Sequence, residues 1–214
     1  MKAEREHRFW EVARRRQPDL TVMLENVHDL HNIGAVLRTA DSVGITEIYV
    51  LQSDPALQFS NLRIGKRTSA GSRRWVDVHY FTDRNSCFEK VREKYARVLG
   101  AYLDDDARSV YELDLTKPTA LLFGNEKSGL TPETLGMCDG SFVIPQMGMA
   151  QSLNISVAGG VCLYEAFRQR QAKGFYNDNL PLDASAQQAI YDEFVRRHEE
   201  KIRPKKAGRF DSRL

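Results

Sequence analysis

Short apolar runs alternate with amphipathic segments over most of this chain. Apolar runs bounded by polar turns are typical of buried strands, whereas apolar residues three and four positions apart are typical of helices. The pattern predicts strands over residues 20–27, 47–52, 75–81, 97–103, 119–124 and 141–145, and helices over residues 32–44, 83–95 and 154–171. Repeated strand-then-helix units favour an α/β fold with a mostly parallel sheet and helices on both faces.

The two ends of the chain follow a different pattern. Residues 2–17 predict a charged helix that Pro18 stops, and Ile190 and Phe194 mark a last amphipathic helix before a basic tail. We therefore expect an N-terminal basic helix over residues 1–18, a sheet domain over residues 19–175, and a C-terminal helix and tail over residues 176–214.

Composition narrows the class of protein. With 214 residues, of which 42% are hydrophobic, the chain can bury a core. Its cysteines, Cys87, Cys138 and Cys162, are widely spaced and form no CxxC pair, which argues against a disulfide framework and against a zinc site. The charged N-terminus lacks an apolar signal core, and no window approaches the ~18 apolar residues of a membrane span. The expectation is a cytoplasmic protein with no membrane partner.

The net charge of +2 hides an uneven distribution. Cations gather at residues 1–16, 63–74 and 196–214, and the middle one of these segments contains no Asp or Glu. Such clusters are typical of surfaces that bind nucleic acid, although a solvated loop explains residues 63–74 equally well.

Three loops follow predicted strands, where ligands of such sheets bind. In the first, Asn32 could simply cap a helix, and Arg38 lies one turn after Gly34, which leaves space for a phosphate or a carboxylate beside the guanidinium. A surface ion pair between Arg38 and Asp41 is the alternative explanation of that arginine.

The other two loops are rich in glycine and polar residues. Residues 121–130, LLFGNEKSGL, leave a buried strand through a turn that either approaches a ligand or is only a turn. Residues 144–160, IPQMGMAQSLNISVAGG, place Ser152 and Asn154 where a helix begins, and helix starts bind anions. Gly159 and Gly160 within that helix suggest that another backbone packs closely there. Neither a phosphate loop nor a dinucleotide fingerprint is present.

Together, in this order and spacing, the loops resemble the three signature motifs of the SPOUT superfamily of RNA methyltransferases, and more narrowly its SpoU/TrmH branch of ribose 2′-O-methyltransferases. The resemblance spans about residues 17–176. The matching positions are Asn32, Gly34 or Ala35, and Arg38 in the first motif; Gly124, Glu126 and Gly129 in the second; and Ile144, Pro145, Gly148, Ser152, Leu153, Asn154, Ser156 and Ala158 in the third. The chain departs from the family in a longer stretch over residues 52–66 and in Gln146, where Met is common.

The resemblance implies a particular fold and cofactor. The sheet would carry a deep trefoil knot in its C-terminal part, although knots are rare in proteins. The knot would hold S-adenosylmethionine, which leaves as S-adenosylhomocysteine, against Ala101, Gly124, Ile144, Met149 and Leu153. The family is also homodimeric, and its first motif reaches the cofactor of the partner subunit.

Segments 14–22, 25–32 and 163–176 resemble the subgroup that methylates guanosine 18 in the D-loop of tRNA. The reaction would transfer a methyl group to the ribose 2′-hydroxyl and would need no metal, because the leaving group is neutral. A guanidinium is hard to deprotonate, so we expect Arg38 to bind the phosphate beside the target ribose and to help accept the proton with it. Asn32 and Glu126 would position Arg38 and the loops, and Ser152 and Asn154 would shape the pocket.

The resemblance also implies a set of contacts to tRNA. The positions that match family RNA contacts are Arg5, Arg16, His31, Arg168 and Arg170, and charge clustering alone adds Lys66, Arg67, Arg73 and Arg74. Three alternatives remain open at this stage: a 2′-O-methyltransferase of ribosomal RNA, a non-catalytic dimeric RNA-binding protein, and a flavodoxin-like nucleotide binder.

Overall fold

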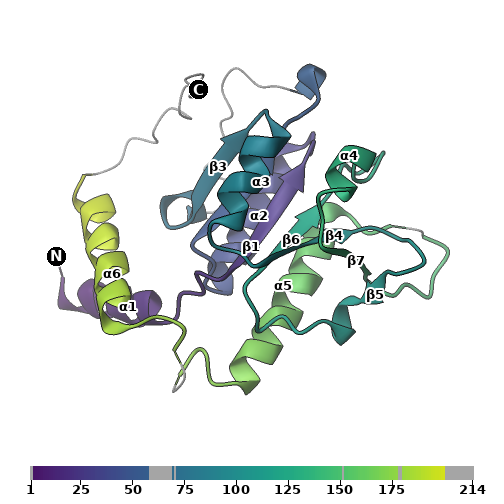
Figure 1. Ribbon diagram of the computed structural model, residues 1–214. Coiled ribbons are helices and arrows are strands. Elements are labelled where there is room, and N and C mark those ends of the chain that lie inside the picture. The colour runs from purple at the N-terminus through teal and green to yellow at the C-terminus, as the bar shows by residue number, and fades with distance from the viewer. Residues whose placement is uncertain (1, 58–68, 70, 151, 178–179, 201–214) are drawn as a thin grey trace.

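A single parallel sheet organises the chain (Figure 1). The computed structural model describes residues 2–57, 69, 71–150, 152–177 and 180–200. Within them seven strands pair in the order β3-β2-β1-β6-β4-β7-β5, and every pair is parallel. The strands are β1 Leu20–Glu25, β2 Glu47–Leu51, β3 Asp77–Phe81, β4 Arg97–Ala101, β5 Arg108–Ser109, β6 Thr119–Phe123 and β7 Gly140–Val143.

Helices cover both faces of this sheet, as the sequence pattern predicts. They are α1 Ala3–Arg14, α2 Leu30–Ser42, α3 Arg84–Arg92, α4 Pro132–Leu135, α5 Ile155–Ala172 and α6 Ala184–Glu199. Successive residues of a strand point to opposite faces. Val22 therefore packs in the core under α2 and α5, whereas Met23 packs in the core under α3. The central strands β1, β2 and β6 are buried along their whole length, which explains why they read as continuous apolar runs.

The register brings the loops that carry the candidate chemistry to one edge. Leu24 pairs with Phe123, and Gly100 pairs with both Leu122 and Ser141, so the carboxyl ends of β1, β6, β4 and β7 lie side by side. The loops that follow these strands must therefore meet at that edge.

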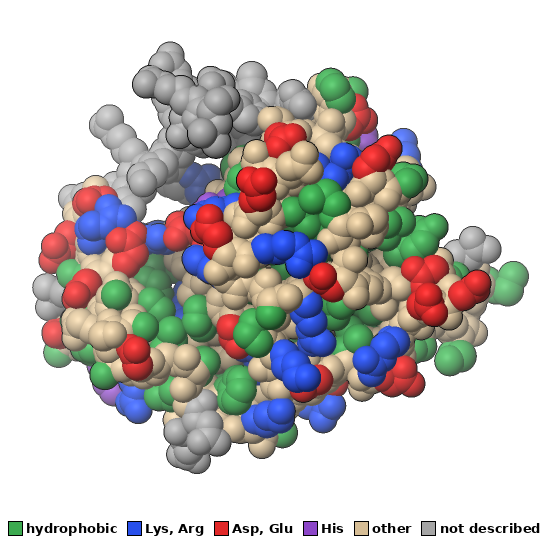
Figure 2. Space-filling view, in the orientation of Figure 1, with side chains coloured by type: hydrophobic (Ala, Val, Ile, Leu, Met, Phe, Trp, Pro, Cys, Tyr) green, Lys and Arg blue, Asp and Glu red, His purple; other side chains and the backbone are tan. Residues whose placement is uncertain are grey.

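The two terminal helices pack on each other beside the sheet domain (Figure 1). Phe9 of α1 and Phe194 of α6 meet the indole of Trp75 in one aromatic cluster. In Figure 2 a hollow separates this pair of helices from the body, and a cavity of about 720 Å³ lies there, at the ends of α2 and α5 far from Asn32. No helix in the described ranges is both long and apolar enough to cross a membrane.

Two arginines that we expected to contact RNA are buried instead. Arg16 is 1% exposed and donates to Asp41 at 2.9 Å and to the carbonyl of Ile45 at 3.0 Å. Burial lowers the pKa of Arg16, and Asp41 counteracts that effect. Arg170 is 0% exposed and donates to Asp19, to Gln17 and to the carbonyl of Leu115.

These contacts leave neither guanidinium accessible to RNA, so the structure corrects the prediction for Arg16 and Arg170. Arg16 ties the segment after α1 to the end of α2. Arg170 connects the end of α5 to Asp19, just before β1, and to residues 115–117. Both are structural residues in this chain.

Replacing Arg170 with Ala should therefore lower stability far more than replacing its neighbour Arg168. Removal of one partner of a buried ion pair leaves Asp19 without its cation and costs about 3 kcal/mol. The Arg168 side chain is 67% exposed and pairs with Glu165 on the same helix, where solvent screening leaves the contact little effect on stability. Urea denaturation of the two variants measures the difference, and equal midpoints would contradict the structural role of Arg170.

Candidate active site

Asn32 lies in the first turn of α2 with its side chain free for a tertiary contact. The residue that caps this helix is Asp29, whose carboxylate accepts from the backbone N–H of His31 at 2.7 Å. The alternative that Asn32 is only a helix cap is therefore wrong, and α2 begins two residues before the predicted boundary. Asn32 Nδ2 instead donates to Glu126 Oε1 at 2.8 Å, across 94 residues of chain.

A second hydrogen bond extends this contact to the third loop. Asn154 caps α5, because its Oδ1 accepts from the backbone N–H of Ser156 at 2.8 Å. Its Nδ2 donates to Asn32 Oδ1 at 3.1 Å. Glu126, Asn32 and Asn154 thus form one chain of hydrogen bonds, which joins the three loops that the sequence singled out. We call this set the three-loop link.

The loop that carries Glu126 turns back on itself very tightly. A Cβ on Gly124 would lie 2.2 Å from the carbonyl carbon of Gly129, so no larger residue fits there. Gly129 itself has a φ of 69°, which favours glycine. Asn125 and Gly129 exchange two backbone hydrogen bonds that close the turn. The glycines at the strand end are therefore required by the shape of the loop.

Arg38 is exposed on a different side of α2. Six residues separate it from Asn32, which at 3.6 residues per turn is about 120° around the helix and about 9 Å along it. Asp41 pairs with Arg16, so the proposed surface ion pair between Arg38 and Asp41 is absent. Among the described residues Arg38 has no hydrogen bond or ion pair, and it is available for an anion. Within one chain it does not hydrogen-bond to Asn32 or Glu126.

The exposed stripe of α2 continues onto α5. His31, Ala35, Arg38 and Ser42 follow one another at helical spacing, with Ala35 partly covered and the others exposed. The two helices pack together, with Gly159 against Val36 and Tyr164 3.4 Å from Ser42. Gly159 thus meets a side chain where we expected a backbone, and the space beside Gly160 is open.

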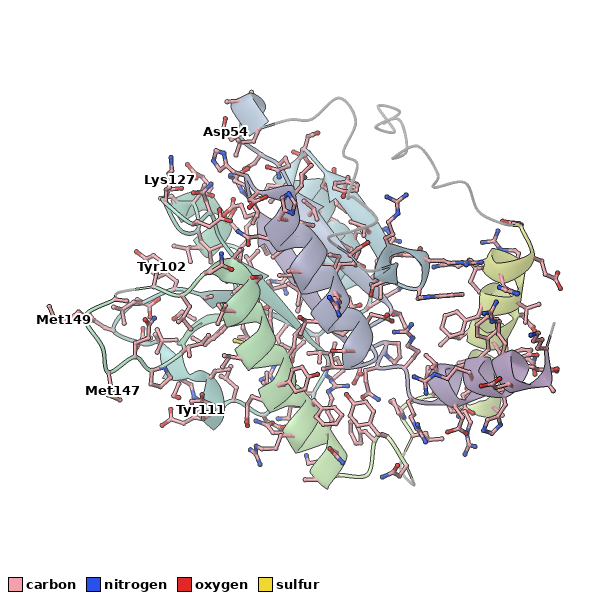
Figure 3. The ribbon with its side chains drawn as sticks, turned by 180° about the vertical axis from the view of Figure 1, so that it is seen from behind. Asp54, Tyr102, Tyr111, Lys127, Met147 and Met149 are labelled. Atoms are coloured by element: carbon pink, nitrogen blue, oxygen red, sulfur yellow. The ribbon has the colours of Figure 1, made fainter. Side chains whose placement is uncertain are left out.

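Exposed apolar side chains surround the loops that follow β4 and β7. Met147 and Met149 are 95% and 100% exposed, and Figure 3 shows them at the edge where Tyr102 also lies. The expected cofactor positions follow neighbouring strands: Ala101 ends β4, Gly124 follows β6, Ile144 follows β7, and Met149 and Leu153 lie in the next loop. Large apolar groups left in water are typical of a surface that a ligand covers.

The other predicted site residues are placed as follows. Ser152 is exposed just before α5, and His31, Arg5 and Arg168 are exposed cations or potential cations. Arg5 contacts His198 at 3.4 Å, and Arg74 donates to the carbonyl of Arg197 at 2.7 Å and lies over the Trp75 ring. Lys66 and Arg67 lie outside the described residues. Across the described residues, no group of three or more His, Cys, Asp or Glu side chains could hold a metal ion.

Sequence reasoning missed Asp29 as the helix cap and Asn125 as the residue that shapes the glycine loop. An Asp three residues before Asn32 is itself a capping signal and could have identified the first. Asn125 gave no such signal, because its partners are distant in sequence or are backbone atoms.

Comparison with known proteins agrees with this geometry. Residues 19–164 match the model of the SpoU rRNA Methylase family. A protein of Thermus thermophilus named tRNA (guanosine(18)-2′-O)-methyltransferase is 44% identical over 193 residues, which are 90% of this chain and 96% of that protein.

Solved structures share the fold. The A. aeolicus TrmH/SpoU tRNA modifying enzyme superposes with a TM-score of 0.81 at 34% identity, over 94% of this chain and 98% of that one. The SpoU methyltransferase AviRb from Streptomyces viridochromogenes, in complex with AdoMet, superposes with a TM-score of 0.64 at 29% identity, over 73% of this chain and 62% of that one. The chain therefore belongs to the SpoU methylase family.

Proposed function

We propose that this protein transfers the methyl group of S-adenosylmethionine to the ribose 2′-hydroxyl of guanosine 18 in the D-loop of tRNA. The observation that carries the proposal is the three-loop link, which joins Asn32, Glu126 and Asn154 into one site. The similarity to the Thermus thermophilus tRNA enzyme extends over 90% of this chain, beyond the family domain, and supports tRNA rather than ribosomal RNA as substrate.

The residues at the sheet edge suit S-adenosylmethionine. Its adenine needs apolar surface, which Leu153 and Met149 offer, and Gly124 keeps the neighbouring loop folded tightly at the end of β6. Ala101 and Ile144 complete this pocket from the ends of β4 and β7. The bound cofactor supplies an electrophilic methyl group on a sulfonium. No metal is needed for the transfer, because the sulfur leaves as a neutral thioether.

Arg38 orients the ribose so that its 2′-hydroxyl can attack the methyl group. Its free guanidinium binds the phosphate beside the target ribose through paired N–H donors, which fixes the 2′-hydroxyl in line with the methyl group. Arg38 and the phosphate that it holds would together orient the 2′-hydroxyl and help accept the proton that this hydroxyl loses on methyl transfer. Asn32 and Glu126 hold the loops around the pocket in position, and Ser152 and Asn154 form the wall of the pocket at the start of α5.

A homodimer brings Arg38 to the cofactor. Arg38 faces away from Asn32 of its own chain, on the stripe of α2 that runs beside exposed Val157 and Tyr164 of α5. The exposed apolar residues of α5, with open space at Gly160, suit close packing of a second copy. A two-fold axis there would carry each Arg38 to the partner's pocket. The first motif thus serves two sites, with Asn32 in its own and Arg38 in the other.

The C-terminal part of the sheet forms a knot in this proposal. β7 lies between β4 and β5, which precede it in the chain, and α5 then packs on residues 110–117, which connect β5 to β6. In the proposed knot, the last part of the chain would pass between segments that are already joined. A deep trefoil knot of this kind would hold the pocket loops rigidly.

The tRNA contacts come from cations outside the pocket. His31, Arg5 and Arg168 remain from the predicted set, with Lys66, Arg67, Arg73 and Arg74 as further positions from charge. Release of counterions from the tRNA phosphates makes binding through such residues fall steeply with salt.

Incubation with tritiated S-adenosylmethionine and unmodified tRNA tests the proposed function. Methylation should map to guanosine 18 and disappear when that nucleotide is a 2′-deoxyguanosine. Arg38→Ala should abolish transfer with cofactor binding nearly intact, and Arg38→Lys should restore little, because an ammonium cannot bind phosphate through a planar fork. Methylation of ribosomal RNA instead, or near-normal turnover in Arg38→Ala, would overturn the assignment.

A charge swap tests the three-loop link. Asn32→Asp replaces the donor to Glu126 with a second carboxylate, and the repulsion should lower turnover by about 100-fold. Adding Glu126→Gln returns a donor to the pair with the roles exchanged, and the double variant should recover at least about tenfold of the loss. Asn85→Asp makes the same substitution at an exposed position of α3, away from the three-loop link, and should leave turnover unchanged. A double variant no better than Asn32→Asp would contradict the pairing.

A further inference from the structure

Residues at the end of β1 bind the loop over residues 124–131, which carries Glu126 and which we call the glycine loop. The last residue of the strand, Glu25, is 0% exposed, and the next residue, Asn26, has a φ of 52°, which is rare outside glycine. Burial of a carboxylate costs free energy unless hydrogen bonds satisfy its oxygens. The hydrogen-bond partners of Glu25 therefore show which part of the structure it stabilises.

Glu25 binds the far end of the glycine loop. Its Oε2 accepts from the backbone N–H of Thr131 at 3.0 Å, and its Oε1 accepts from the hydroxyls of Thr131 at 2.8 Å and Thr134 at 2.5 Å. Arg84 donates to the same two hydroxyls and lies 3.8 Å from the carboxylate. Thr131 is the cap of α4, so the start of that helix is fixed directly to β1.

Asn26 binds the near end of the same loop. Its carbonyl accepts from Asn125 Nδ2 at 2.6 Å, in a buried contact. Asn125 Oδ1 in turn accepts from the backbone N–H groups of Lys127 at 2.7 Å and Ser128 at 3.3 Å. The loop over residues 124–131 is therefore fastened at both ends to the end of β1, to Glu25 and to Asn26, which follows the strand, and Glu126 lies between the two fastenings.

We propose that Glu25 and Asn125 are positioning residues for methyl transfer, which hold the loop over residues 124–131 in the shape that brings Glu126 to Asn32. This inference rests on the proposed function for its kinetic consequence. The contacts of Glu25 and Asn26 with the loop over residues 124–131, which we call the clamp, are a property of the fold. Glu25 and Asn125 are both buried, so we assign neither of them a contact with substrate or cofactor. Their effect passes through Glu126, so their loss should lower turnover without weakening tRNA binding.

A second buried carboxylate separates positioning from general stability. Glu47 is 7% exposed and accepts from Lys94, His79, Tyr49 and Tyr95. It begins β2, at the opposite edge of the sheet from the site. Glu47→Gln should destabilise the protein as Glu25→Gln does, but it leaves the glycine loop in place.

Steady-state kinetics and thermal unfolding of the full chain test the proposal. Glu25→Gln and Asn125→Asp should each lower kcat by about tenfold or more with an unchanged KM for tRNA. Asn125→Asp replaces the donor to Asn26 with a carboxylate oxygen that the Asn26 carbonyl repels, and it keeps the acceptor for residues 127 and 128. Glu47→Gln should lower Tm comparably and keep kcat within about twofold. Equal effects of Glu25→Gln and Glu47→Gln on kcat would overturn the proposal.

Coupling to Glu126 supplies a readout that a merely structural role would not change. In a Glu126→Ala background, measured by single turnover, Glu25→Gln should cost less than about twofold, because the loop no longer has Glu126 to position. A full multiplicative loss in that background would show that Glu25 acts elsewhere and would overturn the proposal.

Hydrogen exchange of the backbone amides tests the clamp independently of any activity. Glu25→Gln should speed exchange at residues 127, 128, 129 and 131 relative to Glu47→Gln. If wild-type protein methylated no tRNA while this difference persisted, the proposed function would fail and the clamp would stand. If wild-type protein were active and exchange in the loop were unchanged, the clamp would fail alone.

Discussion

The hydrogen bond from Asn32 to Glu126 is the contact on which the geometry of the site depends. It joins residues 94 positions apart, and Asn154 extends it to a third loop at 3.1 Å. Asn32 is free for this contact because Asp29 caps α2. Asn154 caps α5 with its Oδ1 and donates to Asn32 with its Nδ2. Parallel strand order brings the loops to one edge, and the three-loop link then fixes their distances.

Burial of charge secures this arrangement on two sides. At the site edge, Glu25 and Asn26 hold the glycine loop, while at the opposite edge Arg16 and Arg170 bind the terminal segments to the sheet. Buried ionic groups like these are costly to separate from their partners, so they fix one arrangement of the chain. Arg38, by contrast, has no partner among the described residues and faces away from Asn32. A free cation beside a rigid site is what recognition of a phosphate requires.

Periodicity was enough to predict the strands of the sheet and the helices on both faces, because buried parallel strands such as β1 and β6 read as unbroken apolar runs. The edge strand β5 escaped prediction, since Arg108–Ser109 is too short to show a period. Motif spacing identified Asn32, Glu126 and Asn154 but did not predict the hydrogen bonds between them. Charge was the weakest guide: Arg16 and Arg170 look like surface cations in sequence, and only the tertiary structure shows the carboxylates and carbonyls that bury them.

In the proposed homodimer, each site combines the three-loop link of one subunit with Arg38 of the other. Mixing two inactive variants, Arg38→Ala and Asn154→Ala, after joint unfolding and refolding measures this most directly. If Arg38 acts across the dimer, each mixed dimer has one intact site, and the mixture should recover about a quarter of wild-type methyl transfer. If the mixture stays as inactive as either variant while mixed dimers form, Arg38 acts within its own chain and the claim is contradicted.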